Sequence, residues 1–253
     1  MIKTLPSSGV VVESPEIFSG YPELTSAVST RKGGLSPEPY GMNLSFKVGD
    51  VSSNVLANRE LFFGSLNITL DRLAIPHQVH GNTVRFAEAA GEFESCDGLV
   101  TDAAGICLVI SVADCLPILM FDPVSRSIAA VHAGWRGSQS GIVSKAIELW
   151  IQKVGIQAKN LIAYIGPGAG VCCYEVGEEV AGAFADRFIA RAPGKKPHLD
   201  VKQMNRELLL EAGVLVHNIE VSGHCTICHP EIFHSYRREG QQSGRMMAVL
   251  GLK

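Results

Sequence analysis

The stretch "ADCLPILMFDPVSRSIAAVHAGWRG", residues 113–137, decides the fold because it predicts a hairpin of two buried strands. Two apolar runs flank the polar, proline-containing segment "DPVSR", residues 122–126. Apolar runs of this length bounded by turn residues are typical of core strands joined by a short connection. The hairpin therefore brings its two outer ends together, and these ends carry Cys115 and His132.

The turn also predicts a register. If residues 122–126 form the turn, Phe121 lies opposite Ser127, and counting back places Cys115 and Leu116 beside Ala133 and His132. Cross-strand neighbours have Cβ atoms about 4.5–5.5 Å apart. A thiolate and an imidazole at that separation can share a metal or act as a nucleophile and its base. The plain structural alternative is a buried cysteine beside a core histidine.

Outside the hairpin, composition limits the function classes. The chain has 253 residues, 46% hydrophobic and 19% charged, which suffices for one sizeable core, and we expect a single domain over residues 1–253. The net charge of −3 argues against nucleic-acid or membrane partners and favours small-molecule substrates. No export-type leader or membrane-length apolar run is evident, so we expect a cytoplasmic protein. In that reducing compartment the seven cysteines are not expected to form a disulfide framework. We expect a monomer or homodimer.

The remaining pattern predicts an α/β (α+β) fold: a layered sandwich of mixed β-sheets flanked by helices. Helices are expected at Ser53–Leu66, Ser140–Val154, Glu178–Ala190 and Val201–Ala212, with Gly155 and Gly213 as C-terminal caps. Strands are expected near Leu73, Val84, Leu108, Ile118, Ile128, Leu161, Val214 and Met246, and residues 190–200 as a surface loop between two helices.

A second histidine source lies upstream in "HQVHGNTV", which carries His77 and His80. Only one of these two can point at the mouth of the hairpin. Together with Cys115 and His132 it would make a three-ligand site with an open fourth position, the pattern of catalytic zinc. Asp114 could orient a ligand histidine or cap the strand end.

Nine ordered motifs resemble the YfiH family, a family labelled both multicopper polyphenol oxidase (laccase-like) and purine nucleoside phosphorylase. They are "STRKGGLS" (29–36), "NLSFKVGD" (43–50), "NREL" (58–61), "QVHGNTV" (78–84), "DGLVTD" (97–102), "SVADCLPILMFD" (111–122), "AAVHAGWRG" (129–137), "IGPGAGVCCYEVGEEV" (165–180) and "FHSYRREGQQSGRMMAVLGL" (233–252). The resemblance implies the layered sandwich that the family shares with Cys-His toxin deamidases of the CNF type.

The resemblance also implies a function. Its zinc ligands correspond to His80, Cys115 and His132, which leaves His77 as a surface or supporting residue, and its activities are phosphorolysis of adenosine, inosine or methylthioadenosine and deamination of adenosine. Arg136, with Ser138 or Ser140 capping the next helix, is a candidate phosphate site. Substrate-binding candidates are Arg31, Asn43 and Gln78, each of which could equally be a turn or cap residue.

Two other enzyme classes stay open. Cys115 and His132 could serve a Cys-His amidohydrolase acting on peptidoglycan precursors. A copper-dependent phenol oxidase is the third reading, although eight histidines, mostly isolated, fall short of a multicopper ligand set. Copper can nevertheless occupy the Cys-His donors in vitro, because its affinity generally exceeds that of zinc.

Two cysteine motifs need separate interpretation. "HCTICHPEIFH", residues 224–234, has the spacing of haem attachment, which would require export. A second zinc site built from Cys225, Cys228, His229 and His234 is the alternative that we disfavour. Cys172 and Cys173 would point to opposite sides of an extended segment, so they are expected not to share a metal. "GPGAG", residues 166–170, is expected to be a tight turn rather than a phosphate loop.

Overall fold

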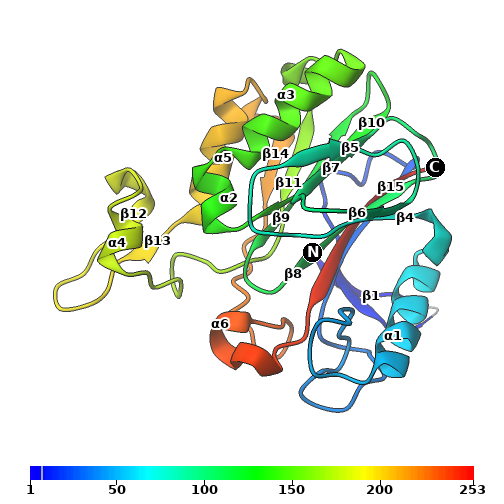
Figure 1. Ribbon diagram of the computed structural model, residues 1–253, viewed down its shortest axis with the longest axis horizontal. Helices are drawn as coiled ribbons and strands as arrows, with labels where there is room; N and C mark the ends of the chain where they lie inside the picture. Colours follow the sequence, from blue (N-terminus) through cyan, green and yellow to red (C-terminus); the bar gives the residue numbers. More distant parts are fainter. Residues whose placement is uncertain (7) are drawn as a thin grey trace.

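Two β-sheets packed face to face form the centre of the protein, in a computed structural model that describes residues 1–6 and 8–253 (Figure 1). The seven-stranded sheet has the order β1-β2-β3-β15-β8-β4-β6 and the six-stranded sheet the order β14-β11-β9-β10-β7-β5. Both sheets combine parallel and antiparallel pairs. The expected layered sandwich of mixed sheets is therefore confirmed.

The strands of the seven-stranded sheet are β1 (Ile2–Thr4), β2 (Val11–Glu13), β3 (Leu24–Ser29), β4 (Leu73–Pro76), β6 (Gly91–Phe93), β8 (Cys107–Val112) and β15 (Met246–Leu252). Those of the six-stranded sheet are β5 (Val84–Phe86), β7 (Gly98–Thr101), β9 (Leu116–Asp122), β10 (Ser127–Ala133), β11 (Ile162–Ile165) and β14 (Ile219–Val221). A separate two-stranded sheet pairs β12 (Ile189–Ala190) with β13 (His198–Leu199).

The helices are α1 (Ser52–Ser65), α2 (Trp135–Gln139), α3 (Ile142–Val154), α4 (Glu178–Ala181), α5 (Val201–Glu211) and α6 (Tyr236–Glu239). Helix α1 covers the outer face of the seven-stranded sheet, and α3 and α5 cover that of the six-stranded sheet. Short 3₁₀ turns lie at Leu70–Arg72, Ala158–Asn160, Asp186–Phe188, Val216–Asn218 and Gly240–Gln242. No helix in the described ranges is long and apolar enough to cross a membrane.

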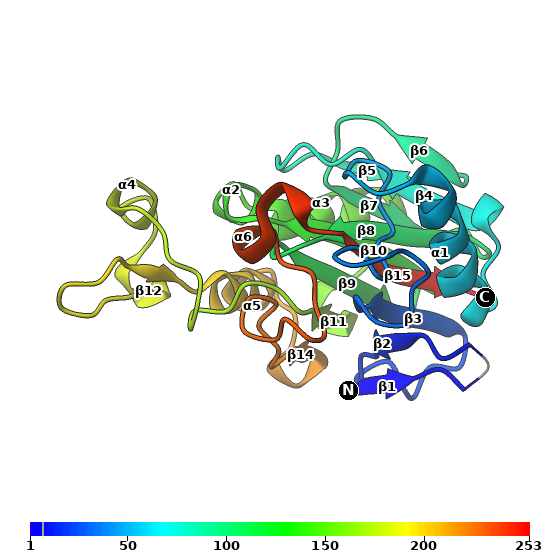
Figure 2. The same cartoon turned by 90° about the horizontal axis from the view of Figure 1, so that it is seen from below.

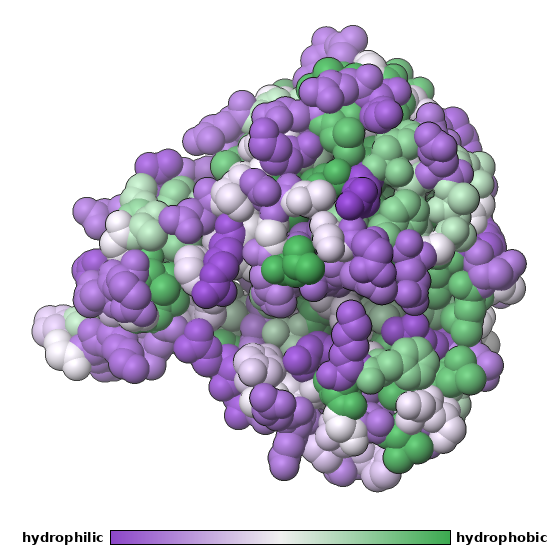
Figure 3. Space-filling view, in the orientation of Figure 1, coloured by the Kyte–Doolittle hydropathy of each residue, from purple (hydrophilic) through white to green (hydrophobic). Residues whose placement is uncertain are grey.

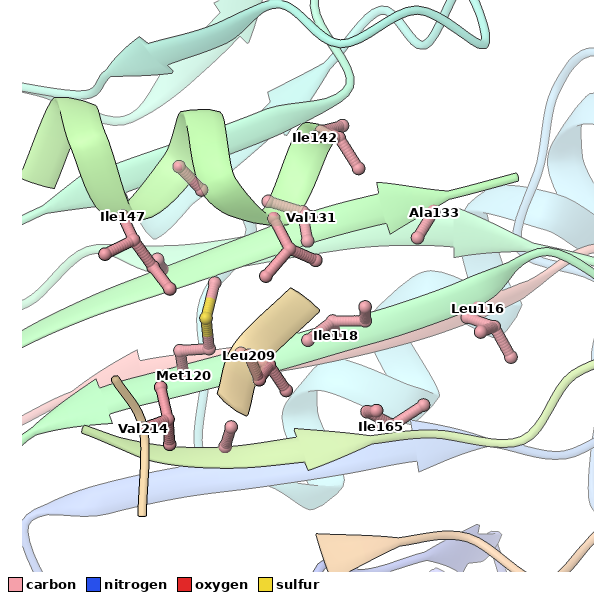
Figure 4. Close-up of a cluster of buried hydrophobic side chains, with 14 of the residues drawn as sticks. Leu116, Ile118, Met120, Val131, Ala133, Ile142, Ile147, Ile165, Leu209 and Val214 are labelled. Carbon is pink, nitrogen blue, oxygen red and sulfur yellow. The ribbon is translucent and has the colours of Figure 1, made fainter. Parts of the chain in front are cut away.

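Strand alternation divides the core into three layers. In β9, Ile118 and Met120 face α3 and α5, whereas Leu119 and Phe121 face the other sheet. Figure 4 shows Leu116, Ile118 and Met120 along β9, with Val131 of β10, in the helix-covered layer. A third layer lies between the seven-stranded sheet and α1. Because β9 and β10 are buried on both faces, their sequences are mostly apolar rather than alternating, with Asp122, Ser127 and His132 as the polar exceptions.

Several expected boundaries are confirmed. Helix α1 and helix α5 lie within one residue of their predicted ends, and α5 is capped by Asp200, whose Oδ1 accepts a hydrogen bond from the N–H of Gln203 at 2.9 Å. Gly155 ends α3 in the left-handed conformation, and Gly213 follows α5 with φ +99°. These positions favour glycine because it has no Cβ.

Other expectations are wrong. The helix predicted at 178–190 ends at Ala181, and the loop predicted at 190–200 contains the β12–β13 pair, which projects from the body as an arm in Figures 1 and 2. Figure 3 shows mostly polar side chains on that arm. Val214 is a buried residue just after α5 and not part of a strand.

Candidate active site

The β9–β10 hairpin forms as predicted but with its register shifted by one residue. Phe121 pairs with Ile128, and Leu116 pairs with Ala133. The turn has four residues, Pro123–Arg126, since Asp122 still pairs with Ser127 in the ladder. Asp122 also caps the turn, because its carboxylate accepts hydrogen bonds from Val124 N at 3.1 Å and Ser125 Oγ at 2.8 Å.

At the open end of this hairpin, the ligand atoms of His80, Cys115 and His132 lie within 4.8 Å of one another. His132 is a residue of β10 and is 3% exposed, whereas Cys115 lies in the connection that precedes β9. The two imidazole rings meet edge to face, with centroids 4.9 Å apart. The structure thus brings together the three residues that the resemblance implied, from three separate segments of the chain.

Asp97 organises this trio. Its buried Oδ1 lies 2.8 Å from Nδ1 of His132 and accepts a hydrogen bond from the N–H of His80 at 2.9 Å. Its Oδ2 accepts from the N–H groups of Val79 at 3.1 Å and Gly81 at 2.8 Å. One carboxylate therefore holds both histidines, and the loop donors offset the strained backbone of His80, which has φ +60°.

Sequence reasoning gave Asp97 no role and left open whether Asp114 orients a ligand histidine or caps the strand end. Asp114 instead accepts hydrogen bonds from Thr226 Oγ1 at 2.6 Å and Arg237 N at 2.6 Å. Asp97 becomes visible only through the pairing of β7 with β10, which sets Gly98 opposite Val131. A Cβ at Gly98 would lie 2.6 Å from Val131 Cγ1, so only glycine fits at this position beside β10. The glycine that follows Asp97 was therefore the one sequence feature that pointed to this close strand pairing.

The charges in the trio are strongly coupled. Burial alone would raise the pKa of the Cys115 thiol, yet His132 and His80 lower it to about 6. Burial would likewise lower the pKa of His132, but Cys115 and Asp97 raise it to about 9. For Asp97, the hydrogen bonds from His132 and from the loop N–H groups outweigh burial and lower the pKa. The site therefore favours a thiolate at neutral pH, the form of cysteine that binds metals or attacks electrophiles.

Gly134 leaves space over the trio. A Cβ at this position would lie 3.0 Å from Cys115 Sγ, 3.6 Å from His80 Cδ2 and 4.0 Å from His132 Cε1. The absence of a side chain at Gly134 thus leaves room beside all three donors. A thiolate and two imidazoles around such a space match the donor set of zinc, and they fit a metal ion.

Arg136 lies in the first turn of α2, and the serine-capped helix start that was expected after it is not formed. Ser140 ends α2, and Gly141 precedes α3, so neither Ser138 nor Ser140 caps α3. The exposed guanidinium of Arg136 stacks on Trp135 at 4.2 Å from the ring centroid, and within residues 1–6 and 8–253 it has no hydrogen-bond acceptor. Trp135 itself lines a small cavity of about 30 Å³ beside Cys115.

The other predicted substrate residues use their polar groups within the protein. Gln78 bonds both the N–H and the carbonyl of Ser111 at 2.8 Å, which ties the His80 loop to β8. Arg31 pairs with Glu239 at 2.8 Å and Glu38 at 3.0 Å. The fully buried Asn43 binds Asp50 and accepts from the N–H of Arg245. His77, as expected, lies at the surface, where it pairs with Glu92 and Glu94.

The cysteine motifs are arranged differently from expectation. Residues 170–173 form a turn, closed by the hydrogen bond from Cys173 N to Gly170 O at 2.9 Å. Because the segment is not extended, Cys172 and Cys173 both lie beside Cys225 and Cys228. The disfavoured set that included His229 and His234 is not assembled, since His229 Nδ1 bonds the carbonyl of Cys225 and His234 is buried near Gly244.

The sequence of this chain is similar to that of several known proteins. A family model described as "Multi-copper polyphenol oxidoreductase laccase" matches residues 25–253. The chain is 30% identical to purine nucleoside phosphorylase YlmD of Bacillus subtilis (strain 168), covering 99% of this chain and 96% of that one. It is 35% identical to adenosine deaminase RL5 of an unknown prokaryotic organism, with 90% and 94% coverage.

A solved structure agrees with these sequence matches. The crystal structure of the Bacillus licheniformis hypothetical protein YfiH superposes with a TM-score of 0.91 at 29% identity, covering 100% of this chain and 99% of that one. The names of the relatives support an enzymatic role. The matched motifs, the full-length similarity and the shared architecture together show that the chain belongs to the YfiH family.

Proposed function

We propose that this protein is a zinc-dependent purine nucleoside enzyme that cleaves adenosine, inosine or methylthioadenosine with phosphate and also deaminates adenosine. The observation that carries the proposal is the convergence of a second histidine, His80, on the thiol of Cys115 opposite His132. A nucleophile and its base need only one histidine. Three soft donors around a space kept open by Gly134 are the ligand pattern of a catalytic metal.

The residues of the chain prepare that site. Asp97 binds Nδ1 of His132, which fixes the tautomer whose Nε2 is free to face Cys115. By holding the N–H groups of residues 79–81, the same carboxylate places His80. A zinc ion held by these three residues supplies Lewis-acid polarisation of a water or a substrate oxygen. The names of two relatives, a phosphorylase and a deaminase, support this chemistry.

We assign phosphate binding to Arg136. Its guanidinium is exposed and stacks on the ring of Trp135, and the residue lies four positions after His132 in the chain. A planar guanidinium that is not engaged with a carboxylate can form paired hydrogen bonds to phosphate. Arg136→Lys should raise the phosphate KM and leave the KM for adenosine little changed, and an unchanged phosphate KM would refute the assignment. Arg31, Asn43 and Gln78 would then act by positioning loops, since their polar groups are engaged within the protein.

A Cys-His amidohydrolase is the second candidate, favoured by the chain Cys115, His132 and Asp97. The pKa values near 6 for the thiol and 9 for the imidazole describe a thiolate–imidazolium pair oriented by a carboxylate. That arrangement suits nucleophilic attack on an amide. It leaves the placement of His80 without a purpose, so we rank it second.

Multicopper phenol oxidation is supported least. In the part of the chain that the structure describes, the only groups of three or more close histidine, cysteine or carboxylate donors are the trio and a set of four cysteines. Laccase chemistry requires several coppers held by clustered histidines. Copper bound at the trio would therefore be a substitute for zinc.

The test is chromatography of adenosine incubated with the purified protein, with and without phosphate. The proposal expects adenine formed only with phosphate, inosine formed without it, and loss of both in Cys115→Ser. Cys107→Ser is the matched control, because Cys107 is buried in the layer beneath α1 and should retain activity. Absence of both products from zinc-loaded wild-type protein would refute the proposal and redirect attention to amide substrates.

A further inference from the structure

A second group of metal-type donors lies outside the trio. Cys172 and Cys173 come from the turn after β11, and Cys225 and Cys228 come from the loop after β14. All four sulfur atoms lie within 4.8 Å of one another, although the two pairs are separated by about fifty residues of chain. Cys172 and Cys228 are exposed, and Cys225 is buried. Such convergence of four thiols is the ligand set of a structural zinc site.

The sulfur geometry fits a tetrahedral ion. Cys172 Sγ and Cys228 Sγ are 3.8 Å apart. With Zn–S bonds of about 2.3 Å, the edge of a tetrahedron of sulfurs is about 3.8 Å. The pair Cys225 and Cys228 has the two-residue spacing that structural zinc sites use repeatedly.

The surrounding backbone is arranged for thiolates. The N–H of Gly170 donates to Cys225 Sγ at 3.2 Å, and a Cβ at Gly170 would lie 3.3 Å from Cys172 Sγ and 3.4 Å from Cys225 Sγ. Hydrogen bonds of this kind to ligating sulfurs orient metal ligands and stabilise their charge.

The negative charge of four close thiolates calls for positive charge at the cluster. Several thiolates cannot coexist at this separation without a cation, because their like charges repel one another. Lys202 lies nearby, where its Nζ donates to the carbonyls of Ser222 and His224 at 2.7 Å. A bound divalent ion would stabilise all four thiolates, and Lys202 would offset the remaining negative charge.

We propose that Cys172, Cys173, Cys225 and Cys228 form a closed structural zinc site, separate from the open trio. This site would clamp the two loops that support Cys115. Gly168 already pairs with Cys225, Thr226 Oγ1 donates to Asp114 Oδ1 at 2.6 Å, and Ala169 N donates to Asp114 O at 2.7 Å. The zinc at the cluster thus positions the residue next to the active-site thiol without touching substrate.

Zinc analysis of purified variants tests the proposal independently of the enzymatic activity. In Cys115→Ser, which weakens the trio, one zinc per chain should remain, and it should be lost when Cys228→Ser is added. Cys228→His should retain the metal, because three cysteines and one histidine also bind zinc. Cys107→Ser is the control that should leave zinc content unchanged. Cobalt replacement should give the absorption of a four-thiolate site that Cys228→Ser abolishes.

A measurement on the wild-type chain covers variants that do not fold. Alkylation followed by mass spectrometry should find the four cysteines protected in the zinc-loaded protein and modified after chelation. A disulfide within the cluster, or equal alkylation with and without chelator, would overturn the proposal. Zinc present in the cluster with no activity on nucleosides would refute only the proposed enzymatic function.

Discussion

Asp97→Asn is the substitution that most directly tests how the active site is built. The carboxylate accepts hydrogen bonds on both oxygens: Oδ1 serves His132 and the N–H of His80, and Oδ2 serves the N–H groups of Val79 and Gly81. An amide replaces one of these oxygens with a donor. In either orientation of the amide, two of the four donors lose their acceptor.

The cost follows from burial. A buried donor left without its acceptor costs about 1–3 kcal/mol, so two such donors predict a loss of about 2–6 kcal/mol in the free energy of unfolding. For a chain of this size, 1 kcal/mol corresponds to about 2–4 °C in Tm, which predicts a decrease of about 4–24 °C. If the amide instead donates to Nδ1, the imidazole proton moves to Nε2, and His132 cannot bind a metal. Zinc affinity should therefore fall about 10–100-fold.

Thermal unfolding followed by circular dichroism, together with zinc competition against a chromophoric chelator, measures both effects. Asp102→Asn is the matched control, because Asp102 is exposed in the same "DGLVTD" segment and should change neither quantity. An Asp97→Asn protein with wild-type Tm and wild-type zinc affinity would refute the role assigned to this carboxylate.

Three further outcomes are expected. Gly134→Ala places a Cβ 3.0 Å from Cys115 Sγ and should weaken zinc binding at least about 10-fold by calorimetric titration, whereas unchanged affinity would show that the space is not the metal site. Hydrogen bonds lower the pKa of Asp97 in the folded protein below its ordinary 3.8, so its contribution to stability should be complete above about pH 5 and lost as the pH falls through the folded-state pKa. Midpoints of urea unfolding measured between pH 2 and 6 should therefore depend less on pH in Asp97→Asn than in the wild type. Tyr164→Phe removes the hydroxyl that donates to the buried carboxylate of Glu13 at 2.7 Å and should cost about 1–3 kcal/mol by urea unfolding, so a loss below about 0.5 kcal/mol would contradict the importance of this bond.

The sequence predicted the features that depend on local pattern. Apolar runs around residues 122–126 predicted the hairpin, and its open end correctly joined Cys115 to the vicinity of His132. The one-residue error in register arose because Asp122 both pairs in the strand and caps the turn. Pattern reasoning cannot separate these two roles of one residue.

Features that depend on distant pairing were not predictable in the same way. Asp97 reaches His132 through the β7–β10 ladder, across thirty-five positions of sequence. The expectation that Cys172 and Cys173 do not share a metal depended on an extended segment, whereas the hydrogen bond from Cys173 N to Gly170 O makes the segment a turn. The helix predicted over residues 178–190 was too long, because α4 ends at Ala181 before Gly182, a residue of low helix propensity.

Reversible metal dependence of nucleoside cleavage tests the central claim most directly. Protein stripped of metal by a chelator, with the metal content measured, would be assayed on adenosine and phosphate before and after addition of one equivalent of zinc in excess of that bound by the four cysteines. The account predicts that adenine and inosine formation disappear on chelation, return with zinc in the wild type and do not return in His80→Ala. Full activity in metal-free protein would contradict it and would favour direct attack by Cys115.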